Sequence, residues 1–333
     1  MDKDKLQKEI SKIVHSYVEK RNHLILSIGV LNKGETATFL YTGSDVSPVD
    51  EDNPPIYEIG STSKVFTTTL LGEMIQDGIL SLNDSIGQYI PKLSDQHPIT
   101  LKHLANHTSG LPDVSLRKFI ANLFKSKKAR DPYCLMSVNE VLQYYYKHPK
   151  EPKLKSSYSN EGMGTLGRIL AKRLNTDYEQ AIKKRIAEPL GMKDTFIKVP
   201  IEKQNRLLKG HDGKGKEQPP VEMNEFAGAG AIRSTINDML LFLKAHMNAE
   251  TKAYQLTQQP SVKVAKNASM GLGWILEGET IWHNGNTLGF SSHLEFEKKR
   301  HIGAVILSNY RMSLFSSNPS LMAKDILQLL RTI

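Results

Sequence analysis

The sequence predicts an α+β fold: one antiparallel sheet built from both chain ends and flanked by terminal helices, with a mainly helical region inserted between its two halves. Two observations predict this arrangement. Segments with the apolar pattern of strands lie near both termini, whereas from about 62 to 250 the apolar residues recur at helical spacing. We therefore expect a sheet domain at residues 1–61 and 250–333, a mainly helical domain at 62–249, and a functional cleft between them.

The N-terminal segment predicts a helix followed by a β-hairpin. Residues 3–20 carry apolar side chains every three or four positions, which places them on one helix face: Leu6, Ile10, Ile13, Val14, Tyr17 and Val18. Apolar side chains then occupy every second position over 24–30. The turn Asn32-Lys33-Gly34 leads into a further extended segment at 36–41, so these two segments are predicted to pair.

The C-terminal segment predicts more strands and a last helix. Leu294 and Phe296 alternate with two glutamates, and three other segments have strand character: 273–276, 280–283 and 302–307. Asn318 followed by Pro319 is typical of a helix start, because asparagine caps free N–H groups and proline fits the first turn. The chain is therefore expected to end in a helix.

The middle of the chain is expected to be helical. Apolar residues recur at helical spacing most clearly in four segments: 64–77, 138–146, 162–174 and 178–186. The whole chain has 333 residues, of which 39% are hydrophobic and 24% charged. These values are ordinary for a globular protein of about two domains, and they exclude a disordered chain or a small disulfide scaffold.

The charge balance is basic, with 44 Lys and Arg against 35 Asp and Glu and a net charge of +9. The basic runs are short and lack interleaved aromatic side chains, which favours a solvated surface over nucleic-acid binding; a weak anionic partner is the alternative. The single cysteine, Cys134, excludes an internal disulfide. Because the histidines lack metal-ligand spacing, we expect no metal and no cofactor.

The sequence also lacks the usual signs of membrane insertion or export. No segment approaches the roughly 18 consecutive apolar residues of a membrane span. The first eight residues are too polar for a signal peptide. We therefore expect a cytoplasmic protein without a membrane span, and make no prediction of its oligomeric state.

The segment Ser61-Thr62-Ser63-Lys64 begins a predicted helix and carries the first candidate chemistry. A serine and a lysine three residues apart share one helix face, and the helix dipole favours negative charge at the serine. A desolvated lysine can accept the serine proton. Taken alone, the pattern also fits a plain N-cap at Ser61, and Ser115-Leu116-Arg117-Lys118 matches it too.

Further segments distinguish these alternatives. His107-Thr108-Ser109-Gly110-Leu111 forms a polar turn, Tyr158-Ser159-Asn160 opens a helix, and His283-Asn284-Gly285-Asn286 ends a short strand. With Gly228-Ala229-Gly230 and Gly271-Leu272-Gly273-Trp274, this ordered set resembles the serine β-lactamase and penicillin-binding protein superfamily, in its class C β-lactamase-like branch. That branch holds DD-peptidases, D-amino-acid peptidases and esterases, and the resemblance implies a β-lactamase/transpeptidase-like fold.

The resemblance implies roles for the residues of the first two motifs. Ser61 would be the acylated nucleophile and Lys64 its proton partner. Tyr158 would move protons between them and the leaving group. Asn160 would hydrogen-bond the acyl amide of the substrate. An acyl-enzyme divides one difficult step into two easier ones.

For the third motif, the resemblance implies that His283 and Gly285 lie on a strand edge that lines the cleft. Backbone N–H groups of Ser61 and Asn286 would form the oxyanion hole. A side chain at position 285 is expected to block the approaching substrate backbone. His107, with its neighbour His103, is interpreted as a turn and packing residue.

Two departures from the family pattern bear on function. His283 stands where resistance-type class C β-lactamases have lysine, and the histidine variant is similar to peptidase and esterase members. An unperturbed imidazole titrates near 6.5, so attraction of a substrate carboxylate is expected to weaken as pH rises through neutrality. The Pro-Gly that usually precedes the tyrosine motif is Pro152-Lys153 here, which predicts a different loop.

The sequence therefore predicts a serine hydrolase that cleaves an amide or ester through an acyl-enzyme. The leading prediction is a D-amino-acid peptidase or carboxypeptidase that β-lactams can acylate. A class C-type β-lactamase, a small-acyl esterase and a non-hydrolysing penicillin-binding sensor are the alternatives. The expected partners are small molecules or short peptides and β-lactams, not nucleic acid.

Overall fold

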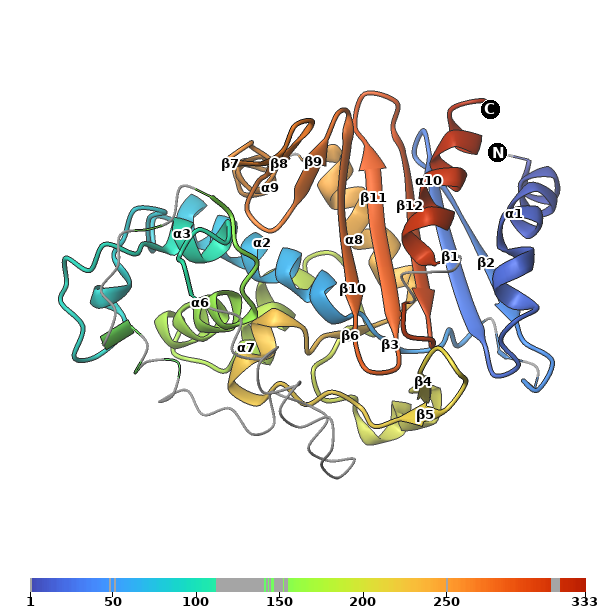
Figure 1. The fold of residues 1–333 in the computed structure, drawn as a ribbon, viewed down its shortest axis with the longest axis horizontal. Coiled ribbons are helices and arrows are strands. Elements are labelled where there is room, and N and C mark those ends of the chain that lie inside the picture. Colours follow the sequence, from blue (N-terminus) through green and yellow to red (C-terminus); the bar gives the residue numbers. More distant parts are fainter. Residues whose placement is uncertain are drawn as a thin grey trace.

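The computed structural model describes residues 2–47, 49–50, 52–111, 141, 143, 145–146, 152, 155–249, 251–312 and 318–333. Its main feature is an eight-stranded antiparallel sheet with the order β2-β1-β12-β11-β10-β9-β8-β7 (Figure 1). The strands of this sheet are β1 (Ile25–Asn32), β2 (Glu35–Thr42), β7 (Val262–Ala265), β8 (Ala268–Met270), β9 (Ile275–Glu277), β10 (Thr280–Asn286), β11 (Ser291–Glu297) and β12 (Ile302–Ser308).

Strands from the two chain ends are neighbours within this sheet. β1 pairs with β12, with Ile28 opposite Ile306, and β2 pairs with β1 as the predicted hairpin. Every residue of β12 is buried, which explains its continuous apolar sequence, because both of its faces are covered. The prediction of one antiparallel sheet assembled from both chain ends is confirmed.

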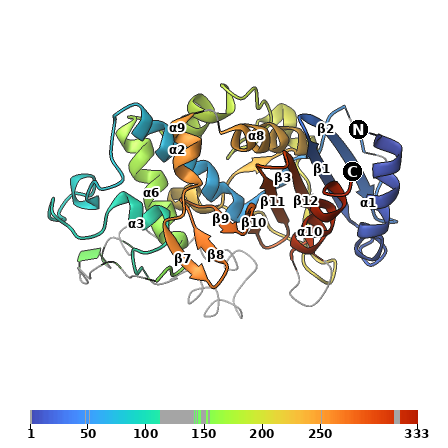
Figure 2. The ribbon, with the colours of Figure 1, turned by 90° about the horizontal axis from the view of Figure 1, so that it is seen from above.

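Two terminal helices, α1 (Lys3–Val18) and α10 (Pro319–Leu330), cover one face of the sheet (Figure 2). The Asn318 side chain accepts the N–H groups of Ser320 and Leu321, and Pro319 takes the first position, as predicted. The apolar stripes of both helices pack against the same side of β1 and β12 and form a core of Leu6, Ile10, Val14, Ile28, Ile306, Met322 and Ile326 with their neighbours.

The other face of the sheet is covered by α8 (Ile236–Asn248), behind which lies α2 (Ser63–Gln76) with α9 (Lys252–Thr257) beside it. Phe66 of α2 stacks on Phe242 of α8, with ring centroids 3.9 Å apart. α2 is buried around most of its circumference, so its position is set by packing on all sides. This central helix carries the serine–lysine motif at its start.

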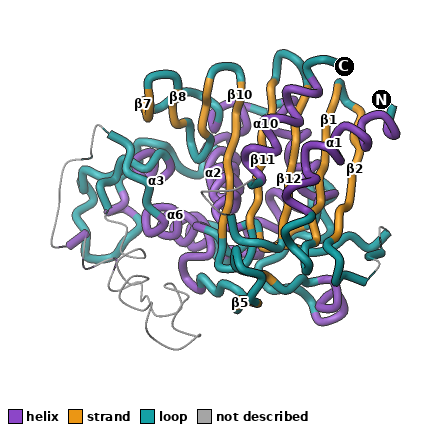
Figure 3. Tube along the Cα trace, turned by 45° about the vertical axis from the view of Figure 1, so that its right-hand side comes forward, coloured by secondary structure: helices purple, strands orange, loops and turns teal. Residues whose placement is uncertain are grey.

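The mainly helical region lies at the other side of α2 from the sheet (Figure 3). Its helices are α3 (Leu101–Ala105), α6 (Asn160–Arg173) and α7 (Tyr178–Ile182). The described part of the chain also contains shorter elements, not all of which belong to this region. They are the 3-10 helices η1 (Gly60–Thr62), η2 (Ile86–Gln88), η5 (Ile201–Arg206) and η6 (Asn224–Ala229), and the π-helical turn η4 (Lys183–Ala187). Two small ribbons pair β3 (Tyr57–Glu58) with β6 (Arg233–Ser234) and β4 (Gly210–His211) with β5 (Glu217–Gln218).

The predicted elements differ from the observed ones in a few places. The helices predicted at 64–77 and 162–174 are α2 and α6, whereas the helix predicted at 178–186 changes from α to π hydrogen bonding at Lys183. The strand predicted at 273–276 begins only at Ile275, because Gly273 has a left-handed φ of 74°. Most of the helix predicted at 138–146 lies outside the described residues.

Candidate active site

Ser61 and Lys64 lie at the junction between η1 and α2, one helical turn apart. The Lys64 side chain is fully buried, and its Nζ donates to Ser61 Oγ at 2.9 Å and to the carbonyl oxygen of Ala229 at 2.6 Å. Ser61 is partly exposed. An amine thus lies within hydrogen-bonding distance of an accessible hydroxyl, which is the geometry that proton transfer from a serine nucleophile needs.

The Ala229 carbonyl belongs to η6, which is tied to α2 by a second contact. Thr67 Oγ1 donates to the carbonyl oxygen of Gly228 at 2.7 Å and lies 2.6 Å from the Tyr178 hydroxyl. The sequence Gly228-Ala229-Gly230 did not by itself predict this role. A main-chain carbonyl cannot be identified from the side chains of a sequence. The glycines of this segment are the feature that could have indicated a close approach of its backbone to the lysine.

The end of β10 lies directly against η1. A Cβ atom at Gly285 would stand 1.9 Å from the carbonyl oxygen of Ile59, and one at Gly60 would stand 2.8 Å from the backbone nitrogen of Asn286. Position 285 is therefore restricted to glycine by the neighbouring backbone of this chain. The expectation that a side chain at position 285 would block the substrate stays a prediction; the structure adds a closer obstacle, the Ile59 carbonyl oxygen.

The backbone of Asn286 thus lies next to the residue that precedes Ser61. The Asn286 side chain has its own partner, because its Oδ1 accepts the N–H of Met312 at 2.9 Å. The resemblance implies that the backbone N–H of Asn286 belongs to an oxyanion hole. Its pairing with Ser61 in that role stays a prediction.

The tyrosine motif lies before and within the first turn of α6. Ser159 is the N-cap and accepts the N–H of Gly162, and Asn160 is the first helical residue and half-buried. Tyr158 is 42% exposed, and its ring centroid lies 4.8 Å from Lys64 Nζ. The structure therefore brings Tyr158 to the serine–lysine pair, from an element far away in sequence.

His283 is buried on β10, and its Nδ1 lies 2.6 Å from the carbonyl oxygen of Asn284. Because a carbonyl only accepts, Nδ1 carries the hydrogen and Nε2 keeps a lone pair. Burial, reinforced by the positive charge of Lys64, lowers the pKa of His283 to about 3. The expectation of an imidazole that titrates near 6.5 is therefore wrong, and His283 is neutral at physiological pH.

His107 lies in a turn and is packed inside the protein, as expected, and it packs against Tyr158. Its side chain is fully buried, and its ring centroid lies 4.6 Å from that of Tyr158. Burial and the nearby charge of Lys64 lower the pKa of His107 to about 3. His107 has a left-handed backbone conformation, with φ of 61°, which the sequence did not predict.

Some residues named in the sequence analysis lie outside the described residues. These are Cys134, Lys153 and the second serine–lysine pattern at 115–118. Among the residues that the structure does describe, no group of three or more His, Cys, Asp or Glu side chains could hold a metal ion. In the same part of the chain, no helix is long and apolar enough to cross a membrane.

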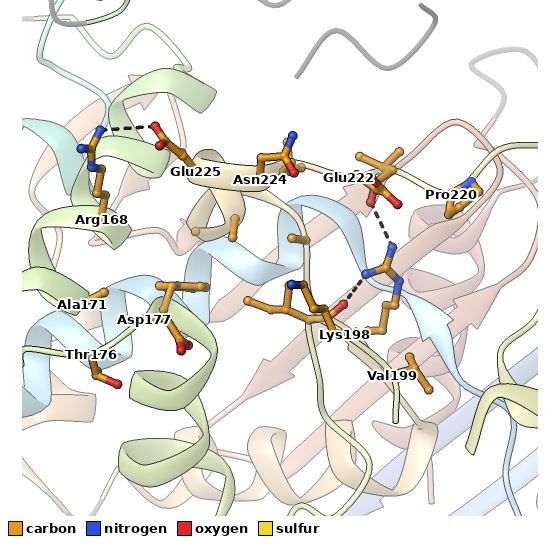
Figure 4. A pocket seen from close by; sticks show the side chains of 18 of the residues that line it. Arg168, Ala171, Thr176, Asp177, Lys198, Val199, Pro220, Glu222, Asn224 and Glu225 are labelled. Carbon is orange, nitrogen blue, oxygen red and sulfur yellow. Dashed lines mark hydrogen bonds and ion pairs between the residues drawn. The ribbon is translucent and has the colours of Figure 1, made fainter. Parts of the chain in front are cut away.

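A separate groove of about 1170 Å³ is lined by α6, η6 and the segment around Lys198 (Figure 4). Arg168 and Glu225 form an ion pair at one end of it, with a nitrogen–oxygen distance of 3.4 Å. Gly228 also lines the groove, next to the Ala229 carbonyl that binds Lys64, whereas Ser61 and Lys64 do not. The groove therefore adjoins the catalytic candidates without containing them.

Comparisons with known proteins cover nearly the whole chain. The sequence model of a family described as Beta-lactamase matches residues 10–323. A β-lactamase from Providencia stuartii is 29% identical over 268 residues, which span 78% of this chain but only 62% of that protein. A β-lactamase from Psychrobacter immobilis is 26% identical, with 92% of this chain and 84% of that protein covered.

Solved structures show the same fold. A class C β-lactamase superposes with a TM-score of 0.82 at 24% identity and covers 99% of both chains. A β-lactamase/D-alanine carboxypeptidase from Pseudomonas syringae superposes with a TM-score of 0.80 at 21% identity, covering 98% of both chains. These similarities confirm the predicted fold class, while the domain boundaries proposed above stay a prediction.

Proposed function

Because the chain belongs to the β-lactamase family of serine hydrolases, we propose that it cleaves short peptides containing D-amino acids through an acyl-enzyme on Ser61. The observation that carries the proposal is the 2.9 Å contact between the buried Lys64 Nζ and the partly exposed Ser61 Oγ. Preorganised proton transfer of this kind is what turns an ordinary serine into a nucleophile.

In the proposed acylation step, Lys64 first releases a proton to solvent; Ser61 Oγ then forms a bond to the substrate carbonyl carbon while the neutral Lys64 amine takes the hydroxyl proton. The backbone N–H groups of Ser61 and Asn286 stabilise the resulting oxyanion. When the carbon–nitrogen bond breaks, the proton passes by way of Tyr158 to the leaving amine. Water then attacks the ester and releases the acyl group, which restores Ser61 with its hydrogen.

The choice of substrate rests on His283. A neutral imidazole offers hydrogen bonds but no positive charge, so it attracts a substrate carboxylate less than the lysine of resistance-type enzymes. A peptidase or esterase tolerates this loss, since the reacting carbonyl is held by the oxyanion hole. The same observation favours a small-acyl esterase as the second candidate function.

β-Lactams are proposed as acylating agents, because their strained amide offers the same carbonyl to Ser61. Several relatives are named β-lactamases, and one solved structure of similar fold is a class C β-lactamase in complex with cefoxitin. A class C-type β-lactamase is therefore the third candidate. It differs from the others in how fast the acyl-enzyme is hydrolysed.

One substrate panel tests these candidates: a fluorescent penicillin, a chromogenic cephalosporin, a peptide ending in D-alanyl-D-alanine and a short-chain nitrophenyl ester. We expect covalent labelling by the penicillin and turnover of the peptide. Turnover of the ester alone would favour the esterase, and rapid cephalosporin turnover the β-lactamase. Labelling without any turnover would indicate a binding protein.

The matched control for this panel is the second serine–lysine pattern. Ser61→Ala should lose every covalent adduct in intact-mass analysis, whereas Ser115→Ala should keep them. An adduct that survives in Ser61→Ala would refute the assignment of the nucleophile.

A further inference from the structure

His107 contacts the backbone on both sides of Tyr158. Its carbonyl oxygen accepts the N–H of Ser157 at 2.7 Å, and its Nδ1 accepts the N–H of Ser159 at 3.2 Å. Its ring also lies against the Tyr158 ring, at 4.6 Å between centroids and an interplanar angle of 32°. His107 thus contacts the backbone of the residue before Tyr158, the backbone of the residue after it, and the ring of Tyr158 itself.

The backbone at His107 has an unusual conformation. Its φ of 61° is left-handed, a conformation in which non-glycine residues are uncommon but histidine and asparagine are enriched. The turn is fixed by the N–H groups of Thr108 and Ser109, which both donate to the carbonyl oxygen of His103. The conformation directs the His107 side chain inward, where it is fully buried.

The hydrogen bond from Ser159 requires an unprotonated Nδ1 on His107. Burial, together with the charge of the neighbouring Lys64, lowers the pKa of this histidine to about 3. At neutral pH the hydrogen is therefore on Nε2 alone, and Nδ1 remains an acceptor.

The side chain of Tyr158 is 42% exposed, so the groups that contact it on its buried side help to decide where its hydroxyl lies. Proton transfer needs that hydroxyl held in line with the reacting groups. We propose that His107 is a positioning residue that fixes the backbone and ring of Tyr158 for proton transfer at Ser61 and Lys64. The inference rests on the proposed acyl-enzyme function.

The variants separate the hydrogen bond from the ring contact. His107→Asn keeps an acceptor near the position of Nδ1 and tolerates the left-handed backbone, but it removes the ring. His107→Ala removes both. His97→Ala is a matched control: His97 is also buried, its Nδ1 accepts the N–H of Ile99 at 3.2 Å, and its ring meets the edge of Tyr145.

The measurement is the rate of covalent labelling by fluorescent penicillin at increasing concentration. We expect His107→Ala to lower the limiting acylation rate about 10²-fold, with a much smaller change in apparent affinity, because misplacing a catalytic group affects the chemical step. His107→Asn should recover most of that loss. His97→Ala should label at the wild-type rate once the folded fraction, from thermal unfolding, is taken into account.

A double mutant tests whether His107 acts through Tyr158. In a Tyr158→Phe background the phenol hydroxyl is already absent, so adding His107→Ala should slow labelling only slightly. A full additional loss there, or wild-type rates in His107→Ala, would overturn the inference while leaving the proposed function in place. A wild-type protein that is never labelled would overturn both.

Discussion

His283 and His293 lie on neighbouring strands, one register position apart, but face opposite sides of the sheet. His283 is opposite Leu294, which points into the core shared with α8, whereas His293 meets Ser320 of α10 on the other side. Both side chains are almost fully buried. The same residue type, in the same sheet, thus has two different environments.

The difference between them is electrostatic. Near His283 the neighbouring charge is the cation Lys64, and burial with that charge lowers the pKa of His283 to about 3. His293 instead has a carboxylate: its Nε2 lies 2.9 Å from Glu295 Oε2 and its Nδ1 3.0 Å from Ser320 Oγ. The face with the lysine disfavours a second cation at His283, whereas the histidine on the α10 face lies beside a carboxylate.

We infer that the two faces of the sheet differ in what they determine: acylation on the face with Lys64, and stability on the face with α10. On the Lys64 face, the polar side chains that contact Ser61 should control the rate of acylation with little effect on folding at neutral pH, because they border a partly exposed serine. Side chains on the α10 face should control stability with little effect on acylation, because His293 contacts Glu295 and Ser320 on the side of the sheet opposite to Lys64. The predictions below test this separation.

The largest effect is expected from Lys64→Ala. Nζ is the group that contacts Ser61 Oγ at 2.9 Å and would take its proton, so the acylation rate should fall about 10³-fold when it is removed. The unfolding temperature should change little in comparison. Penicillin labelling and thermal unfolding of the same preparation measure both quantities, and near-normal labelling would show that another base activates Ser61.

Glu295→Ala should do the reverse. Removing the Glu295 carboxylate leaves the buried Nε2 of His293 without its hydrogen-bond partner, and the free energy of unfolding should fall by about 2 kcal/mol. The labelling rate per folded molecule should stay within a few-fold of wild type. Glu279→Ala is the control, because its ion pairs with Lys299 and Arg300 are more exposed and should matter little for stability.

Gly285→Ala should affect both stability and acylation. The new Cβ would stand 1.9 Å from the Ile59 carbonyl oxygen, so β10 and η1 must separate. We expect a loss of about 2 kcal/mol in unfolding free energy, as is typical of overpacking, together with slower acylation because Asn286 moves with the strand. Unchanged acylation in a clearly destabilised variant would argue against Asn286 in the oxyanion hole.

The parts of this molecule that sequence predicts best are the local ones. The Ser61–Lys64 contact follows from helical spacing alone, and the helix start at Asn318 follows from its capping chemistry. The sheet was predictable because apolar periodicity marks strands regardless of what covers them. In each case the relevant interactions lie within a few residues or repeat along the chain.

The environments of the histidines could not be predicted in this way. Whether His283 is charged depends on Lys64, more than two hundred positions earlier, and on burial that the strand pattern does not specify. The link between His107 and Tyr158 likewise joins a left-handed turn to a distant helix start. Such properties arise only when the elements assemble.

The smallest effect concerns pH and follows from the lowered pKa of His283. Since the imidazole is already neutral, the ratio of kcat/KM for a carboxylate-bearing peptide to that for a neutral ester should stay flat between about pH 6 and 8. His283→Lys should raise the ratio by adding a cation. A wild-type ratio that falls with rising pH would show that His283 titrates near its ordinary value.

The same shift has a consequence for stability, whose sign is opposite to that of a salt-bridged histidine. The unfolded chain binds a proton at position 283 near pH 6.5, whereas the folded chain does so only near 3. The unfolded state therefore gains protons first as pH falls, and the stability present above about pH 6.5 declines toward pH 3. In urea unfolding measured across this range, His283→Asn should show a shallower decline than wild type, and an equal decline would locate the titrating groups elsewhere.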